Sequence, residues 1–290
     1  MIKLGCNYYP EVTELIEEGK IDIDYFKYPG LGYQMDIFKK EDLSDYKQLV
    51  SQINRVRPVM IHGLGLKPHN ICSKTFIQDL DIDYVKQIIE LSGINGISLH
   101  LAGVDYLLSR KQSKEIIINN IKYLKEQFHD LDFISFENAD GNPYSPYSKN
   151  GELGICIESN FISEIIYETG SDFLLDISHA YCSSKKLKVD FETYLYELPI
   201  DKVYEIHING WIETESDIMS HTKINEIGYM TLEKLLKDCS PKIITLEYGR
   251  SSDRLNSGIP IISPNNICNE AKDEIVSQIT RLREIINNHI

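Results

Sequence analysis

Side chains of the kind that bind metal ions recur at the ends of short apolar runs along this 290-residue chain. The runs and their last residues are VMIH (His62), ISLH (His100), FISFE (Glu137), FLLD (Asp176), YEIH (His207) and IITLE (Glu247). Imidazole offers a neutral nitrogen donor, and a carboxylate can bridge two ions while cancelling part of their charge. Histidine and carboxylate ligands without cysteine are typical of iron, manganese or zinc sites.

Two further histidines extend this set. LLDISHAY places His179 three residues after Asp176, and IMSHTKINEIG places His221 in what we expect to be a loop after the next strand. A single histidine or carboxylate at a strand end is more often an ordinary core residue, but repetition at six strand ends favours a metal site. Eight candidate ligands exceed the needs of one ion, so they indicate two or three ions that share a carboxylate.

Eight short and mostly continuous apolar runs are predicted to be the strands that position these side chains. Parallel strands buried on both faces have such runs, whereas half-exposed strands alternate apolar and polar residues. The predicted strands are Ile2–Asn7, Ile23–Tyr28, Pro58–His62, Gly96–Leu101, Asp132–Glu137, Asp172–Asp176, Val203–His207 and Ile243–Glu247.

Amphipathic patterns between the strands predict helices at Asp83–Leu91, Ser113–Phe128, Ser159–Thr169, Phe191–Glu197, Thr231–Asp238 and Asn269–His289. Ser113 is the expected N-cap of its helix, and Gly170 stands where a C-cap belongs. Strands alternating with helices imply a parallel sheet. Eight strands in 290 residues favour an α/β fold of one domain, 1–290, closed as a single (β/α)₈ TIM barrel; an open doubly wound sheet is the alternative.

In such a barrel the carboxyl ends of all strands converge on one face, so ligands far apart in sequence would meet there. The segments Asp140–Gly154 and Ser251–Asn269 follow strands on that side, and we expect them to be loops that could contact a substrate. The segment HGLGLKP lacks the G-K-[ST] ending of a phosphate-binding loop. Its Gly63 is expected to let the backbone pass close to His62.

Composition limits the classes of function. A net charge of −14 and the lack of a Lys/Arg block argue against nucleic-acid binding but suit a carboxylate-rich cation site. The opening residues MIKLGCNYYPEV lack the basic and apolar pattern of a signal peptide, so none is expected. No run approaches the roughly 18 to 20 apolar residues that span a bilayer. The six cysteines are scattered without a C-x-x-C pair, so we expect a reduced, cytoplasmic protein.

The motifs ENADGNPY, LLDISHA, EIHING and LEYG, in this order, resemble the xylose isomerase-like TIM-barrel superfamily. Within it, the opening GCNYYPEVTELIEEGKIDIDYFKYPG, LLDISHAYCSSKKL, VYEIHINGW and LEYG look most like the multinuclear non-heme iron-dependent oxidative (MNIO) enzymes. The resemblance runs from Leu4 to Gly249. Two other branches matter: endonuclease IV-type AP endonucleases with three zinc ions, and sugar isomerases or epimerases with one or two divalent ions.

The resemblance places His62, His100, Glu137, Asp176, His207, His221 and Glu247 on metal-ligand positions. Glu137, Asp176, His207 and Glu247 fit every branch and are the expected catalytic core. His179 stands where the best-known MNIO enzymes commonly have Asn and the endonuclease branch has His. The family pattern also has an Asp two residues before His221, where this chain has Met219. Asp217 could substitute, or the third ion could be weak or absent, so the number of ions stays open.

The resemblance implies two or three iron ions, O₂ as oxidant, and a cysteine-containing peptide or small thiol as substrate, with a possible partner protein that presents it. The alternative is a zinc phosphodiesterase of the endonuclease IV type, or a sugar isomerase or epimerase using a divalent ion such as manganese. A third hypothesis is a non-catalytic barrel kept as a binding module. Among the residues considered, only Met219 favours it.

Overall fold

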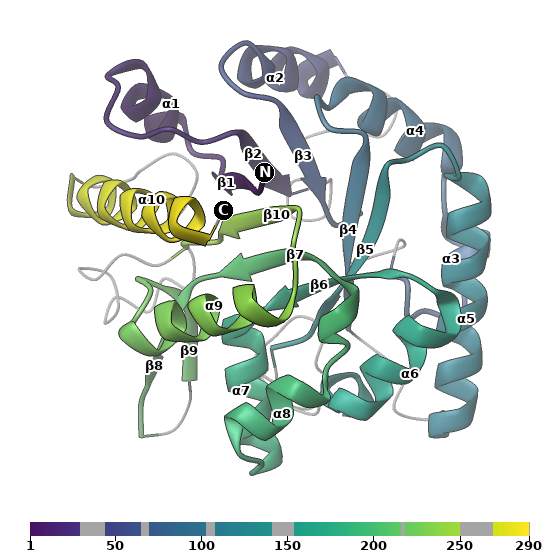
Figure 1. The fold of residues 1–290 in the computed structure, drawn as a ribbon. Coiled ribbons are helices and arrows are strands. Elements are labelled where there is room, and N and C mark those ends of the chain that lie inside the picture. Colours follow the sequence, from purple (N-terminus) through teal and green to yellow (C-terminus); the bar gives the residue numbers. More distant parts are fainter. Residues whose placement is uncertain are drawn as a thin grey trace.

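Eight parallel strands close into a barrel in the order β1-β10-β7-β6-β5-β4-β3-β2, with helices around it (Figure 1). The computed structural model describes residues 1–29, 44–64, 70–102, 108–140, 154–215, 218–249 and 269–289. The strands are β1 (Lys3–Asn7), β2 (Tyr25–Pro29), β3 (Val59–His62), β4 (Gly96–Leu101), β5 (Phe133–Asn138), β6 (Asp172–Asp176), β7 (Val203–Ile208) and β10 (Ile243–Leu246). The predicted (β/α)₈ TIM barrel is therefore confirmed, and the open sheet is excluded.

All eight predicted strands are found, and their ends differ from the predicted ends by at most two residues. The largest difference is at β2, which begins at Tyr25 rather than Ile23. Continuous apolar runs identified these strands because both faces of each strand are covered, one by the barrel interior and one by helices.

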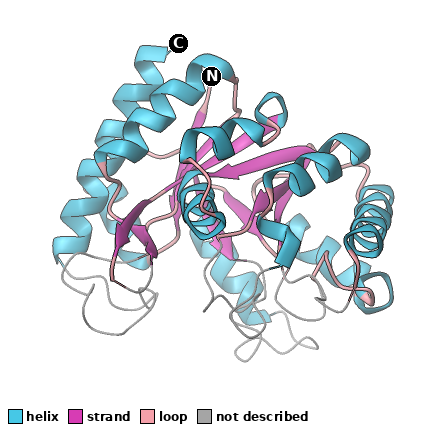
Figure 2. Cartoon of the chain, turned by 90° about the horizontal axis from the view of Figure 1, so that it is seen from below, coloured by secondary structure: helices cyan, strands magenta, loops and turns pink. Residues whose placement is uncertain are grey.

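Helices cover the outside of the barrel in both views, and the two chain termini lie close together (Figures 1 and 2). The helices are α1 (Pro10–Glu17), α2 (Ser44–Asn54), α3 (Phe76–Asp79), α4 (Ile82–Leu91), α5 (Arg110–Gln127), α6 (Ser159–Thr169), α7 (Ile177–Leu187), α8 (Phe191–Glu197), α9 (Glu226–Asp238) and α10 (Asn269–His289). The sequence patterns did not predict α1, α2, α3 or α7. In the described part of the chain, none of the helices combines the length and apolar character needed to cross a bilayer.

Two predicted helix starts are wrong. Helix α5 begins at Arg110 because Ser109, not Ser113, is its N-cap. The Ser109 hydroxyl accepts a hydrogen bond from the Gln112 backbone N–H, and the Gln112 side chain accepts one from the Ser109 backbone N–H. Both backbone N–H groups at the start of the helix therefore have a hydrogen-bond acceptor. Helix α9 begins at Glu226 rather than Thr231. The predicted C-cap Gly170 is confirmed, with a left-handed φ of 55°.

A two-stranded antiparallel hairpin, β8 (Gly210–Glu213) and β9 (Ile218–Thr222), is inserted between β7 and α9. Its Trp211 ring stacks on Tyr181 of α7, with the ring centroids 4.4 Å apart. His221 lies on β9, so the prediction that it occupies a loop is wrong. Residues 141–153 and 251–268, the bulk of the two predicted long loops, lie outside the described residues.

Candidate metal centre

The eight predicted ligands all come from the carboxyl-terminal end of the barrel. His62, His100, Glu137, Asp176 and His207 lie on β3 to β7, and Glu247 directly follows β10. The register of the sheet pairs them: His100 is opposite Glu137, and Asp176 is opposite His207. Neighbours in register point to the same face, so these side chains share the barrel interior.

An irregularity between β6 and β7 produces the second of these pairs. Phe173 is opposite Val203, but the next residue, Leu174, is opposite Glu205, so the register shifts by one residue. A one-residue shift reverses which side chains share a face. The shift therefore brings Asp176 beside His207 instead of beside Ile206.

Glu137 lies at the centre of the cluster and is fully buried. Its Oε2 atom is 3.2 Å from His62 Nε2 and 3.1 Å from His100 Nε2. Its Oε1 atom is 3.3 Å from His179 Nδ1 and 3.2 Å from His207 Nδ1. One carboxylate thus contacts four imidazoles from four different elements, as a ligand shared between ions would.

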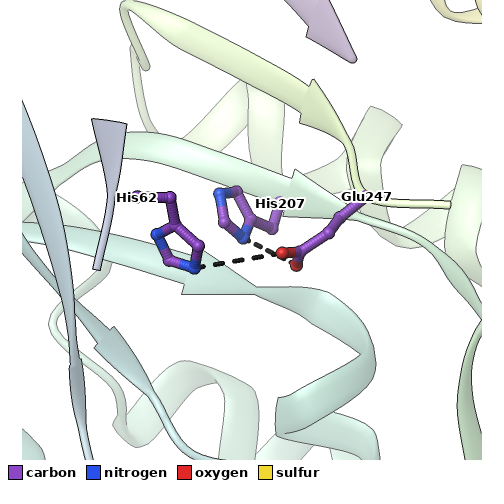
Figure 3. A group of neighbouring side chains, drawn as sticks. All are labelled: His62, His207 and Glu247. Atoms are coloured by element: carbon purple, nitrogen blue, oxygen red, sulfur yellow. Dashed lines mark ion pairs between the residues drawn. The ribbon is translucent and has the colours of Figure 1, made fainter. Parts of the chain in front are cut away.

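Glu247 joins a second group with His62 and His207, and the three side chains point toward one another (Figure 3). Glu247 Oε2 is 2.9 Å from His207 Nδ1, and Glu247 Oε1 is 3.9 Å from His62 Nε2. Three groups of donor atoms lie within 4.8 Å of one another: His62–His207–Glu247, His62–His100–Glu137 and Glu137–Asp176–His207–Glu247. The groups overlap without coinciding, so the donors fit more than one ion position.

Several buried nitrogen and oxygen atoms of these residues make no hydrogen bond of acceptable geometry, although they lie close to one another. They are His62 Nε2, Glu137 Oε1 and Oε2, His207 Nδ1 and Glu247 Oε2. Burying a polar atom without a partner costs free energy, and native proteins rarely leave several together. Because these atoms belong to the same overlapping groups, bound cations would satisfy them all. The donor set fits a metal centre.

His179 and His221 lie together at one side of this centre. Their Nε2 atoms are 3.5 Å apart, and His179 Nε2 is 3.8 Å from Asp176 Oδ2. His179 lies in the first turn of helix α7. Asp176 is the N-cap of this helix and accepts the His179 backbone N–H at 2.7 Å. Among the described residues, neither histidine belongs to a group of three close donors.

The backbone of His221 has a left-handed φ of 60°, which is uncommon for a residue with a side chain. Asn209 holds it there, since its Oδ1 accepts the His221 N–H at 2.8 Å while its Nδ2 donates to Asp176 Oδ2 at 2.9 Å. Strained residues of this kind gather at functional sites. Met219 lies on the same strand, and Asp217 is outside the described residues.

Charge and burial set the protonation of the cluster. Burial works to raise the pKa of Glu137, but the imidazoles of His100 and His207 outweigh it and hold that pKa well below its usual range. Burial lowers the pKa of His100 to about 4 and raises the pKa of Asp176. Glu247 also has a pKa well below its usual range, because His207 outweighs its burial. The cluster thus keeps anionic oxygens that attract cations.

Sequence reasoning missed the side chains that hold the ligands. Asn138 accepts the Asp176 backbone N–H at 2.9 Å, and Ser98 Oγ is 2.9 Å from His62 Nδ1. Asn209 ties Asp176 to His221. Both asparagines stand one or two residues after a predicted ligand, in FEN and HING, which is the signal that could have identified them.

Gly210→Ala should displace the hairpin that carries His221. A Cβ atom at this position would lie 1.8 Å from the backbone oxygen of Lys223, and backbone cannot yield as a flexible side chain does. We expect a loss of about 1–3 kcal/mol in the free energy of unfolding and weaker metal binding. Denaturant unfolding and metal titration measure both. Unchanged values would show that β8 is not fixed against Lys223.

The fold and the donor set define a xylose isomerase-like TIM barrel with a histidine–carboxylate centre. Residues 145–256 match the sequence model of the family described as "RiPP precursor modification enzyme MbnB/TglH/ChrH". Over that part of the chain, this match bears out the predicted resemblance to the MNIO family.

A UPF0276 protein of Psychromonas ingrahamii is 27% identical over 197 residues, which are 64% of this chain and 66% of that protein. The chain thus matches slightly less than two thirds of that relative's length. A xylose isomerase domain protein from Alicyclobacillus acidocaldarius matches in structure over 100% of this chain and 99% of its own, with a TM-score of 0.58 and 14% identity. The crystal structure of SacUVDE covers 100% of both chains, with a TM-score of 0.57 and 13% identity. At these identities the structures bear on the fold alone.

Proposed function

We propose that the protein is a multinuclear non-heme iron-dependent oxidative enzyme that uses O₂ to modify a cysteine-containing peptide or a small thiol. One observation carries the proposal: three groups of histidine and carboxylate side chains overlap, because His62, Glu137, His207 and Glu247 each belong to two of them. Overlap of this kind suits two or three adjacent ions better than one. The sequence match to RiPP precursor modification enzymes favours a peptide substrate.

The eight predicted ligands would hold the ions, and adjacent irons would supply Lewis acidity toward a thiolate and redox chemistry toward O₂. Glu137 would bridge ions, since its two oxygens face different pairs of histidines. The catalytic core of Glu137, Asp176, His207 and Glu247 lies deep, with Glu247 the most exposed at 12%. Such burial keeps water from the reacting groups.

The more exposed ligands mark the side from which a substrate would approach. His100 and His221 have side chains 22% and 23% exposed, whereas Glu137 and His207 are fully buried. A thiol that approaches from the side of these two histidines would meet them before it meets the deep ligands. We propose a partner protein that presents a peptide on this side. We also propose a reducing, cytoplasmic setting, since the cysteines of the described residues are not joined in disulfide bonds.

Protein expressed and purified anaerobically with iron should carry at least about two irons per chain. With O₂ it should change the mass of a peptide containing one cysteine, and a matched peptide with serine at that position should stay unchanged. Metal analysis with Mössbauer spectroscopy and mass spectrometry measure these outcomes. Under about half an iron per chain, with zinc in its place, would contradict the proposal.

A second candidate, a zinc phosphodiesterase of the endonuclease IV type, is favoured by His179. This side chain directs Nε2 toward His221 Nε2 at 3.5 Å, as a ligand would, at a position where the best-known MNIO enzymes commonly have Asn. Incubation of zinc-loaded protein with abasic DNA tests it, and an aldose–ketose assay with Mn²⁺ tests the isomerase alternative. Nicking or isomerisation at rates above those of a metal-free control would favour these activities over oxidation.

A further inference from the structure

A buried ion pair lies inside the barrel beneath the metal centre. Lys27 of β2 and Glu205 of β7 are 1% and 0% exposed, and Lys27 Nζ is 2.6 Å from Glu205 Oε1. Thr245 donates its hydroxyl to the same oxygen at 3.0 Å, and Tyr25 OH is 2.6 Å from the Thr245 hydroxyl. Burying two charges in a barrel core carries a large desolvation penalty. The pair therefore calls for a role beyond packing.

The ion pair contacts one predicted ligand, His207, from the side away from the other ligands. Glu205 Oε1 is 3.1 Å from His207 Nε2, and Lys27 Nζ contacts the same nitrogen. The other ring nitrogen, Nδ1, is 2.9 Å from Glu247 Oε2 and 3.2 Å from Glu137 Oε1. His207 thus presents Nδ1 to the metal centre and Nε2 to the ion pair.

Three other histidines of the centre direct Nδ1 toward a neutral oxygen, and His179 Nδ1 also lies 3.3 Å from Glu137 Oε1. The pairs are His62 with Ser98 Oγ (2.9 Å), His179 with the Asn138 carbonyl (3.0 Å) and His221 with the Glu247 carbonyl (3.2 Å). A neutral imidazole has one N–H and one lone pair, so the outer acceptor decides which nitrogen can bind a metal. Of these four histidines, His207 is the one that directs Nε2 to a carboxylate outside the set of predicted ligands, that of Glu205.

We propose that Glu205 and Lys27 are positioning residues for the metal centre. Glu205 accepts the Nε2 hydrogen of His207, so that Nδ1 directs its lone pair to the ions. The ammonium of Lys27 is itself a donor, so it directs its hydrogens to Glu205 rather than to His207 Nε2. Lys27 compensates the charge of Glu205, which would otherwise be an unpaired buried anion. An oxygen that accepts the outer N–H of a metal-bound histidine fixes the orientation of the ring and the nitrogen that faces the ion. The inference rests on the metal centre of the proposed function.

Two double variants separate the effect of the hydrogen bond between residue 205 and His207 from the effect of the Lys27–Glu205 charges. They are Lys27→Met with Glu205→Gln, and Lys27→Met with Glu205→Leu. Both remove the ion pair and nearly conserve volume, and such replacements are often tolerated. The Gln variant keeps an oxygen that can accept the Nε2 hydrogen of His207, whereas the Leu variant does not. In Co²⁺ titrations followed by visible absorption, we expect the Gln variant within about threefold of the parent affinity and the Leu variant about 10–100-fold weaker.

Parent-like affinity and an unchanged Co²⁺ spectrum in the Leu variant would overturn the inference. Equal weakening in both variants would also overturn it, by assigning the effect to the lost charges. Should the Leu variant fail to fold, ¹⁵N NMR of the zinc-loaded parent decides the matter. A hydrogen on His207 Nε2 is expected, and one on Nδ1 would contradict the proposal. Parent protein that takes up neither Co²⁺ nor Zn²⁺ would instead contradict the metal centre of the proposed function.

Discussion

Glu137→Gln should lower metal affinity by more than about 100-fold. This loss is larger than the loss typical of mutating a residue that only hydrogen-bonds to a metal ligand. The substitution keeps the shape of the side chain but removes the charge that faces His62, His100, His179 and His207. A neutral amide cannot bridge two ions and cancel their charge. Metal analysis after loading, and turnover of the thiol substrate, should both fall to background.

Glu158→Gln is the matched control, because Glu158 is a partly exposed carboxylate paired with Arg110 outside the centre. It should keep the metal content and activity of the parent. Thermal unfolding of both metal-free variants shows whether each folds. If folded Glu137→Gln protein retained the parent's metal content, Glu137 would not be the shared ligand that its position indicates.

Removing the metal ions should lower the thermal stability of the protein strongly. Ions that bind the folded state at 100 times their Kd stabilise it by about 2.7 kcal/mol for each site. For a protein of this size, that corresponds to roughly 4 °C in Tm per site. The physical reason is that His62, Glu137, His207 and Glu247 have buried nitrogen and oxygen atoms that make no hydrogen bond, and metal ions would coordinate these atoms. Scanning calorimetry before and after chelation measures the difference.

The Glu137→Gln variant supplies the control for this experiment. Having lost its ions, it should show little change in Tm when chelator is added. Identical melting of the parent with and without chelator would mean that the buried donors do not hold metal in the folded protein. Restoration of the higher Tm by added Fe²⁺ or Zn²⁺ should accompany the expected result.

Features that repeat along the chain were the ones that could be predicted from sequence. A strand buried on both faces must be apolar along its length, so a His or carboxylate at its end stands out, as His62 and Asp176 do. Helix α7 was missed because its sequence, ISHAYCSSKKL, is polar and has no regular apolar stripe. Its buried face includes serines, which a hydrophobic pattern does not detect. The start of α5 was misplaced because two serines four residues apart compete as caps, and only contacts with Gln112 distinguish them.

The partners inside the barrel could not be read from the sequence. Lys27 and Glu205 are 178 positions apart, and each alone resembles an ordinary surface charge within a strand. Their contact depends on which residues of β2 and β7 face inward at the same depth, which sheet closure decides. The same holds for Asn209, whose two hydrogen bonds join Asp176 to His221.

By itself, the sequence determined the eight strands and the candidate ligands at their ends, because hydrophobic runs and strand-end polar residues are local properties. The tertiary structure decided how those ligands combine. The shift after Phe173 sets Asp176 beside His207, and the β8–β9 hairpin returns His221 toward His179. Register and chain reversal depend on packing between distant segments, so no local pattern specifies them.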